Sequence, residues 1–201
     1  MLLQRIQQRW IDSADLQYQC AQQLAPGLET ACNAMVAALT GGGKVLACGT
    51  GLSSTQAMFL TGALVSQLER ERPELAAVPL GTSAAVIHGI QAGLDSRQLF
   101  ARHVRALGSP GDVLVILTAQ PASDDLEAAV HAAHERDMVV VALTAAKPGL
   151  LAEVMRDTDV LLSVPTTKPA AVMELHQAAL HSLLDGIDVL LLGEETPEEK
   201  E

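Results

Sequence analysis

The sequence predicts an α/β domain of three layers, with a five-stranded parallel sheet between layers of helices. Two observations lead to this fold class. Five short aliphatic runs lack the alternation of a half-exposed strand, so they are expected to be buried on both faces of a sheet. The segments between them have helical composition, which suits the crossovers that parallel strands need. At 201 residues, the chain fits one domain with its own core.

The predicted strands all lie after residue 43. They are KVLACGT from Lys44, AAVPLG from Ala76, DVLVILTA from Asp112, MVVVALTA from Met138 and DVLLSVPT from Asp159. Their spacing predicts a five-stranded flavodoxin-like sheet, in which ligands bind at the carboxyl ends of the strands.

Two extra helices are predicted before the sheet. The first spans 2–24, and the second begins at Pro26, which suits a first-turn position, and is stopped by the glycines at 41–43. A sheet of this kind does not need these helices for its own core. Their apolar stripes therefore predict either packing against another subunit or docking onto the same domain, and the sequence leaves both open.

The last helix is predicted from about Ala170 to Leu192, because this segment is strongly apolar, and it is expected to end at Gly193. The remaining tail, 194–201, is acidic and expected to be disordered.

Composition narrows the class of function. Aromatic residues make up 2% of the chain and the net charge is −11, which argues against binding nucleic acid. Three widely spaced cysteines indicate neither a disulfide framework nor a zinc site. His131 and His134 could share a helix face, but we expect that face to be exposed to solvent, so no metal or cofactor is predicted.

The N-terminus lacks a signal peptide's apolar core and no run approaches about 20 apolar residues, so a cytoplasmic location is expected.

The turn after the first strand is the strongest candidate for a ligand site. Thr50, Gly51, Ser53 and Ser54 lie where a strand leads into a helix, and such a turn exposes N–H groups at the positive end of the helix dipole. It matches neither a P-loop nor a dinucleotide fingerprint. A tight turn with a serine N-cap explains the same residues equally well.

Two other places offer polar groups. After the third strand, Thr118 and Ser123 supply hydroxyls, but the acidic residues that follow disfavour a bound phosphate. At the start of the last helix, Glu174 and His176 are two residues apart and so do not face each other. A buried histidine bonded to the backbone is the simpler interpretation of His176.

Several phrases of the sequence resemble, in order, the sugar isomerase (SIS) domain of the phosphoheptose isomerase group. These are GGKVLACGTGLSS, ERPELAAVPLGT, RALGSPGDVLVILTA, ERDMVVVALTA and AVMELHQAALHSLLDGID. Within that group they look most similar to the regulatory branch of DnaA initiator-associating proteins (DiaA). The resemblance covers nearly the whole chain. It implies one SIS domain over 1–193, with a helical pair in 1–41 and the sandwich in 44–193, assembled as a homotetramer.

The resemblance also implies where this chain departs from the isomerases. They transfer a proton between C1 and C2 of sedoheptulose 7-phosphate, using a histidine and a glutamate on one helix; Phe59 and Ala63 stand at those positions here. An Asn-Asp pair corresponds to Ala92 and Gly93. No catalytic residue is therefore expected, and the residual sugar-phosphate site is expected to comprise Thr50, Gly51, Ser53, Ser54, Thr118, Ser123, Glu174 and His176.

These departures favour a non-catalytic regulator that binds the replication initiator DnaA as a homotetramer, with Leu191 and Leu192 as contact residues. Those leucines equally well complete the core face of the last helix. The alternatives are a sugar-phosphate isomerase with a rearranged site, which would need a replacement acid near His176 such as Asp95, and a sugar-phosphate sensor without turnover.

Overall fold

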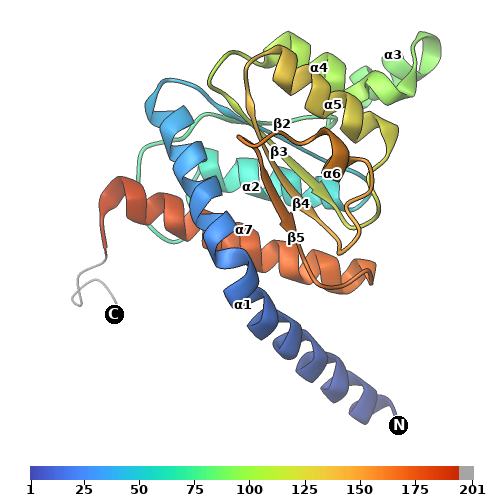
Figure 1. Cartoon of the computed structure of the whole chain (residues 1–201), viewed down its shortest axis with the longest axis vertical. Coiled ribbons are helices and arrows are strands. Elements are labelled where there is room, and N and C mark those ends of the chain that lie inside the picture. Colours follow the sequence, from blue (N-terminus) through green and yellow to red (C-terminus); the bar gives the residue numbers. More distant parts are fainter. Residues whose placement is uncertain (195–201) are drawn as a thin grey trace.

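The computed structural model describes residues 1–194 and has the predicted three-layer architecture (Figure 1). All five strands are parallel, in the order β2-β1-β3-β4-β5. The strands are β1 Val45–Gly49, β2 Ala77–Pro79, β3 Val113–Thr118, β4 Val139–Thr144 and β5 Val160–Ser163. The predicted fold class and each predicted strand are confirmed.

Helices cover both faces of the sheet (Figure 1). They are α1 Leu2–Thr40, α2 Ser53–Val65, α3 Ala84–Gly93, η1 Ser96–Gln98, α4 Leu99–Leu107, α5 Asp124–Glu135, α6 Leu151–Val154 and α7 Pro169–Leu192. The predicted last helix therefore matches α7 closely. The predicted disordered tail lies outside the described residues, apart from Glu194.

The core has two halves, one on each face of the sheet. Alternate residues of each central strand point to opposite sides, as the pleat requires. Val113 and Val115 pack with α1, α2 and α7, whereas Leu114 and Ile116 pack with α4, α5 and α6. All four side chains are buried, which explains why the strands read as continuous apolar runs.

The two helices predicted before the sheet are one continuous helix of 39 residues, so that prediction is corrected. Pro26 lies inside α1 and removes one backbone hydrogen bond, at a cost of about 3 kcal/mol in an isolated helix. Tertiary packing outweighs this cost, because Leu24 and Ala31 on either side are buried. Gly27 also lets the helix approach β5, since a Cβ there would lie 2.5 Å from a methyl of Leu162.

Of the two explanations for the N-terminal apolar stripes, docking onto the same domain is confirmed for the second half of α1, and packing against another subunit stays a prediction. From Cys20 onward, the buried residues of the helix pack against the same domain and against α7. The first half projects away from the body, and Ile6 and Trp10 are exposed on it (Figure 1). Within residues 1–194, no helix has the length and apolar content to cross a membrane.

Candidate functional site

The carboxyl ends of β1 and β3 lie side by side and carry two of the predicted site residues. Thr118 donates a hydrogen bond to the carbonyl oxygen of Gln120 at 2.8 Å. Its hydroxyl also lies 3.0 Å from the hydroxyl of Thr50, so Thr50 is the donor in that contact. Both hydroxyls are therefore already used to join the two strand ends, and neither is a free donor for a ligand.

A pocket of about 170 Å³ opens beside these strand ends. In this strand order, β1 and β3 flank the topological switch point, where ligands of such sheets bind. The pocket is lined by Thr50, Gly51, Leu52, Ser53, Ala119, Gln120, Pro169 and Met173. The loops after β1 and β3 thus meet the N-terminal turns of α2 and α7 in one place.

The turn after β1 brings backbone groups close together, which explains its glycines. A Cβ on Gly49 would lie 2.5 Å from the carbonyl oxygen of Ser53, and Gly51 has a φ of +55°. Ser54 donates to the carbonyl oxygen of Gly51 at 2.7 Å, as a serine of a tight turn does. Ser54 therefore fits the structural explanation of this turn.

Ser53 is different. Its side chain is 1% exposed, it lines the pocket, and its hydroxyl has no hydrogen-bond partner. A buried polar atom without a partner is unfavourable, so it indicates a water or ligand group at this point. The neighbouring Gln56 joins α2 to α7 by donating to the carbonyl oxygen of Met173 at 2.8 Å.

The loop after β3 is less suited to an anion. Ser123 is exposed and its hydroxyl donates to the carboxylate of Asp125. That carboxylate also accepts a hydrogen bond from the backbone N–H of Leu126 at 2.9 Å, so this N–H group in the first turn of α5 already has a partner. The first turn of α5 carries three acidic residues in all, and they would repel a phosphate.

The two predicted residues on α7 point to different surroundings. Glu174 forms an ion pair with Arg9 and accepts from Ser13 at 3.0 Å, so it faces α1. His176 is fully buried, and neither ring nitrogen has a hydrogen-bond partner. Burial lowers the pKa of His176 to about 4. His176 is thus neutral at physiological pH and closed off from solvent.

His181 is a residue of this region that the sequence analysis missed. It lies one turn and a half beyond His176 on α7, is exposed, and contacts Gln177, with 2.9 Å between Nε2 of each residue. Its ring packs against Phe59 of α2, with 5.5 Å between the ring centroids. The spacing of four between Gln177 and His181 was the available signal, since such residues share a helix face.

The remaining isomerase positions offer no acid or base. Ala63 lies one turn beyond Phe59 and is buried, and the Cβ position of Gly93 faces open space at the end of α3. Asp95 caps η1 and pairs with Arg97. It lies with α4 and α5 on one face of the sheet, whereas α7 lies on the other, so Asp95 is not the replacement acid near His176.

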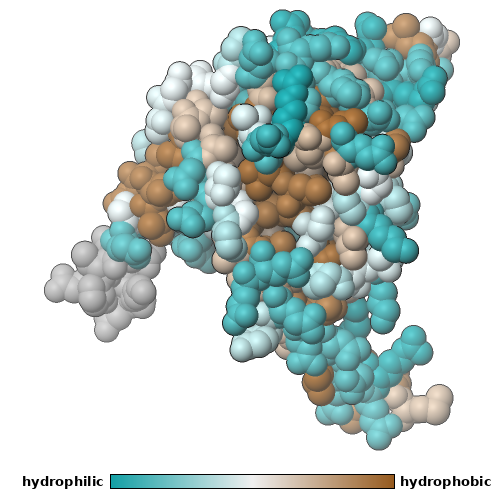
Figure 2. All heavy atoms as spheres, in the orientation of Figure 1, coloured by the Kyte–Doolittle hydropathy of each residue, from teal (hydrophilic) through white to brown (hydrophobic). Residues whose placement is uncertain are grey.

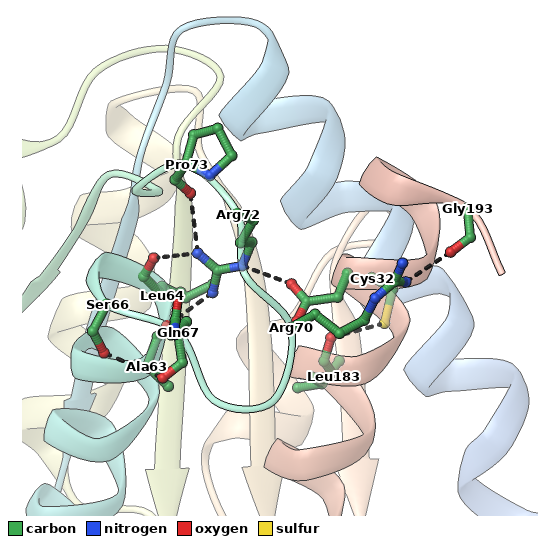
Figure 3. A network of polar contacts seen from close by, with 11 residues as sticks. Cys32, Ala63, Leu64, Ser66, Gln67, Arg70, Arg72, Pro73, Leu183 and Gly193 are labelled. Carbon is green, nitrogen blue, oxygen red and sulfur yellow. Dashed lines mark hydrogen bonds and ion pairs between the residues drawn. The ribbon is translucent and has the colours of Figure 1, made fainter. Parts of the chain in front are cut away.

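Two arginines hold the far ends of α2 and α7 (Figure 3). Arg72 is buried, pairs with Asp188 at 2.6 Å, and donates to the carbonyl oxygens of Ala63 and Leu64 at 2.8 Å each. Arg70 donates to the carbonyl oxygen of Gly193 at 2.7 Å. Arg72 thus satisfies carbonyl groups in the last turn of α2, and Arg70 satisfies that of the residue that follows α7.

A second pocket, of about 220 Å³, lies against this network. Its lining includes Glu69, Arg70, His181 and Asp185, so both charge signs are present. His181 is therefore exposed to solvent and lies near charged side chains, whereas His176 is buried.

The two histidines considered for metal binding are not equivalent. His134 is buried and its Nε2 lies 2.7 Å from Asp159, whereas His131 is exposed near Glu127. The expectation of a solvated face therefore holds for His131 and is corrected for His134. Residues 1–194 contain no group of three or more histidine, cysteine or acidic side chains placed to hold a metal ion.

The predicted contact leucines lie at the end of α7. Leu191 is half-buried against the core, and Leu192 is 42% exposed. In Figure 2, hydrophobic residues gather over this end of the helix, where Leu190 is exposed as well.

Comparisons with known proteins give one consistent likeness. The model of the SIS domain family matches residues 10–145. The phosphoheptose isomerase of Methylibium petroleiphilum is 44% identical to this chain, over 97% of this chain and 98% of that relative. The phosphoheptose isomerase of Azoarcus sp. is 42% identical, over 96% of this chain and 98% of that relative. The structure of a phosphoheptose isomerase from Francisella tularensis has a TM-score of 0.89 at 35% identity, covering 94% of this chain and 98% of that one. The GmhA structure from Neisseria gonorrhoeae has a TM-score of 0.87 at 35% identity, covering 94% and 99%.

These findings contradict the expected main function, a non-catalytic regulator that binds DnaA. The similar proteins are named phosphoheptose isomerases, and the likeness extends over almost the whole of each chain. They support one of the alternatives drawn from the sequence, the sugar-phosphate isomerase.

Proposed function

The chain belongs to the phosphoheptose isomerase family of SIS domains, and we propose that it binds sedoheptulose 7-phosphate in the pocket between β1 and β3 and interconverts its ketose and aldose forms. The observation that carries the proposal is the hydroxyl of Ser53, which is buried in that pocket without a partner. A ligand oxygen placed there would remove the cost of the unpaired hydroxyl.

The geometry supports an extended ligand along α7. Met173 at the pocket and His181 are eight residues apart, or about 12 Å along the helix axis. A phosphate at the pocket would direct the open chain of the sugar along α7 toward His181. Isomerisation moves a proton between C1 and C2, which needs an accessible base. His181 is exposed, whereas His176 is buried, so His181 is the proposed proton carrier.

A sugar-phosphate sensor is the second candidate, and one observation favours it. α2 carries no acidic residue and no histidine from Ser53 to Val65. The resemblance to the isomerases implies their acid–base pair at Phe59 and Ala63, and neither side chain can transfer a proton. A protein that kept the pocket without these groups would bind the sugar phosphate and not convert it.

A homotetramer is proposed as the assembly. The first turns of α1 expose Leu2, Leu3, Ile6 and Trp10, which is more apolar surface than a projecting helix normally leaves in water. On α2, the apolar side chains of Met58 and Val65 are each 50% exposed, as expected of a helix that a second subunit covers.

The deciding experiment separates binding from turnover. Calorimetric titration with sedoheptulose 7-phosphate measures affinity, and detection of the aldose product measures conversion. We expect saturable binding that Ser53→Ala weakens and Ser96→Ala, an exposed serine on the opposite face, leaves unchanged. Binding with conversion supports the isomerase, and binding without it supports the sensor. Absence of binding at millimolar ligand contradicts both.

A further inference from the structure

His181 is the last member of a chain of hydrogen bonds that runs between α2 and α7. The side-chain amide of Gln56, in α2, donates to the backbone carbonyl oxygen of Met173 at 2.8 Å. The same amide nitrogen makes a longer contact, of 3.4 Å, with the side-chain oxygen of Gln177. The amide nitrogen of Gln177 in turn lies 2.9 Å from Nε2 of His181. A backbone carbonyl group is thus connected to the imidazole ring through two glutamine side chains.

The first member of this chain fixes the direction of every bond in it. A backbone carbonyl oxygen only accepts, so the group of Gln56 that faces Met173 is its NH2. Because the same NH2 also faces Gln177, the oxygen of the Gln177 amide lies toward Gln56 and its NH2 toward His181. Turning the Gln177 amide around would set two NH2 groups against each other and lose a hydrogen bond.

This direction determines which nitrogen of His181 carries the proton. An amide NH2 only donates, so Nε2 of His181 is the acceptor and holds the lone pair. A neutral imidazole has one N–H and one lone pair, and its proton is therefore on Nδ1. Among residues 1–194, no group forms a hydrogen bond with Nδ1, and the side chain is exposed. The N–H group of the ring, and not its lone pair, is thus free to meet a ligand.

We propose that Gln177 is a positioning residue that holds the neutral ring of His181 with its proton on Nδ1, so that this N–H donates a hydrogen bond to the carbonyl oxygen of the sugar. The proposal rests on the proposed function and adds which atom of His181 meets the ligand. A donor at this oxygen polarises the carbonyl group and stabilises the negative charge that develops on it during isomerisation. Gln56 has a part in this arrangement, since it orients the amide of Gln177.

The sharpest test reverses the hydrogen bond without changing the size of the side chain. In Gln177→Glu the carboxylate only accepts, so Nε2 of His181 should carry the proton and Nδ1 the lone pair. Nitrogen NMR of isotope-labelled histidine distinguishes the two forms in the free protein, because protonated and unprotonated ring nitrogens have well-separated chemical shifts. Spectra are recorded at about pH 8, above the usual range of imidazole titration. The spectrum of His181→Gln identifies the signals that belong to His181.

The same variant tests the role of this N–H toward the ligand. With sedoheptulose 7-phosphate, Gln177→Glu should lower kcat by about 100-fold, as expected when one donor to a developing negative charge is lost, while KM changes little. Gln177→Leu should lower kcat by a smaller factor, because the ring can then adopt either form. In a protein that binds without turnover, Gln177→Glu should instead weaken the affinity by about tenfold.

The matched control is Gln91→Glu, which makes the same change at an exposed glutamine of α3 and should alter neither the spectrum of His181 nor kcat. If wild-type His181 carries its proton on Nε2, or Gln177→Glu leaves it on Nδ1, the assignment of the proton is wrong. If the proton moves in Gln177→Glu but neither kcat nor affinity changes, the role toward the ligand is wrong. If the proton behaves as proposed but the wild type does not bind the sugar phosphate, the proposed function fails and the assignment of the proton stands.

Discussion

His176 and His181 lie on the same helix, yet their surroundings give them opposite chemistry. His176 is sealed between α7 and the sheet, where its charged form would lose its hydration without gaining a partner. His181 is at the surface beside Phe59 and ionisable groups. Burial keeps His176 neutral at physiological pH, whereas the exposed ring of His181 is accessible for the proposed proton transfer.

The buried His176 makes stability depend on pH. An unfolded chain protonates this imidazole near pH 6.5, but the folded protein only near pH 4. The contribution of His176 to the free energy of unfolding is therefore expected to be constant above about pH 7. It should fall by up to about 3 kcal/mol as the pH drops from 6.5 to 4, since each unit of pKa difference corresponds to about 1.4 kcal/mol.

Urea denaturation across this pH range measures the effect in the wild type and in His176→Leu. Every other ionisable group is common to the two proteins, so the difference between the two curves isolates His176. Equal slopes for the two proteins between pH 6.5 and 4 would contradict the assignment.

The proposed proton carrier has its own test. His181→Gln keeps a polar side chain of similar size, and should lower kcat for sedoheptulose 7-phosphate by about 100-fold or more while ligand affinity changes little. His131→Gln, an exposed histidine on the other face of the sheet, is the matched control. An unchanged kcat in His181→Gln would assign the proton transfer to another group.

At the scale of elements, α2 and α7 form one unit that is joined at both ends. Near the pocket, Gln56 bonds to the backbone of α7. At the far end, Arg72 bonds to the last carbonyl groups of α2 and to Asp188 of α7 (Figure 3). This double connection fixes the distance between Ser53 and His181, on which the proposed ligand position depends.

Breaking the far connection should be costly. Arg72→Met leaves the carboxylate of Asp188 buried without a counter-charge, and the free energy of unfolding is expected to fall by about 3–5 kcal/mol. The double variant Arg72→Met/Asp188→Leu should recover much of this loss, because no charge then remains buried. Arg105→Met, which breaks the exposed pair with Glu135, should have a much smaller effect in the same urea titrations. A double variant as unstable as Arg72→Met would contradict this account.

For the whole molecule, the projecting half of α1 is the feature that the single chain leaves unexplained. If the proposed homotetramer covers it, light scattering after gel filtration should give four times the chain mass. Ile6→Glu/Trp10→Glu should give a smaller assembly, because charges would enter an apolar contact. Leu107→Glu, at an exposed leucine of α4, is the control. A monomeric wild type, or a double variant that remains tetrameric, would contradict this prediction.

Local patterns of the sequence were sufficient to predict the five strands, the parallel sheet and α7. Strands buried on both faces must be continuously apolar, and a helix that packs along its length must be apolar over many turns, so both features appear in short windows. The turn at Gly49–Ser54 was visible for the same reason, since Gly49 is required by a close contact within the turn and Gly51 by its positive φ.

Tertiary structure alone decided the chemistry of the individual side chains. Glu174 pairs with Arg9, 165 residues away, and Pro26 stays within one helix because packing against the sheet and α7 outweighs its local cost. Likewise, only the packing of α7 distinguishes the buried His176 from the exposed His181. Each of these outcomes depends on contacts between distant parts of the chain, and the spacing of residues along a helix or strand does not carry that information.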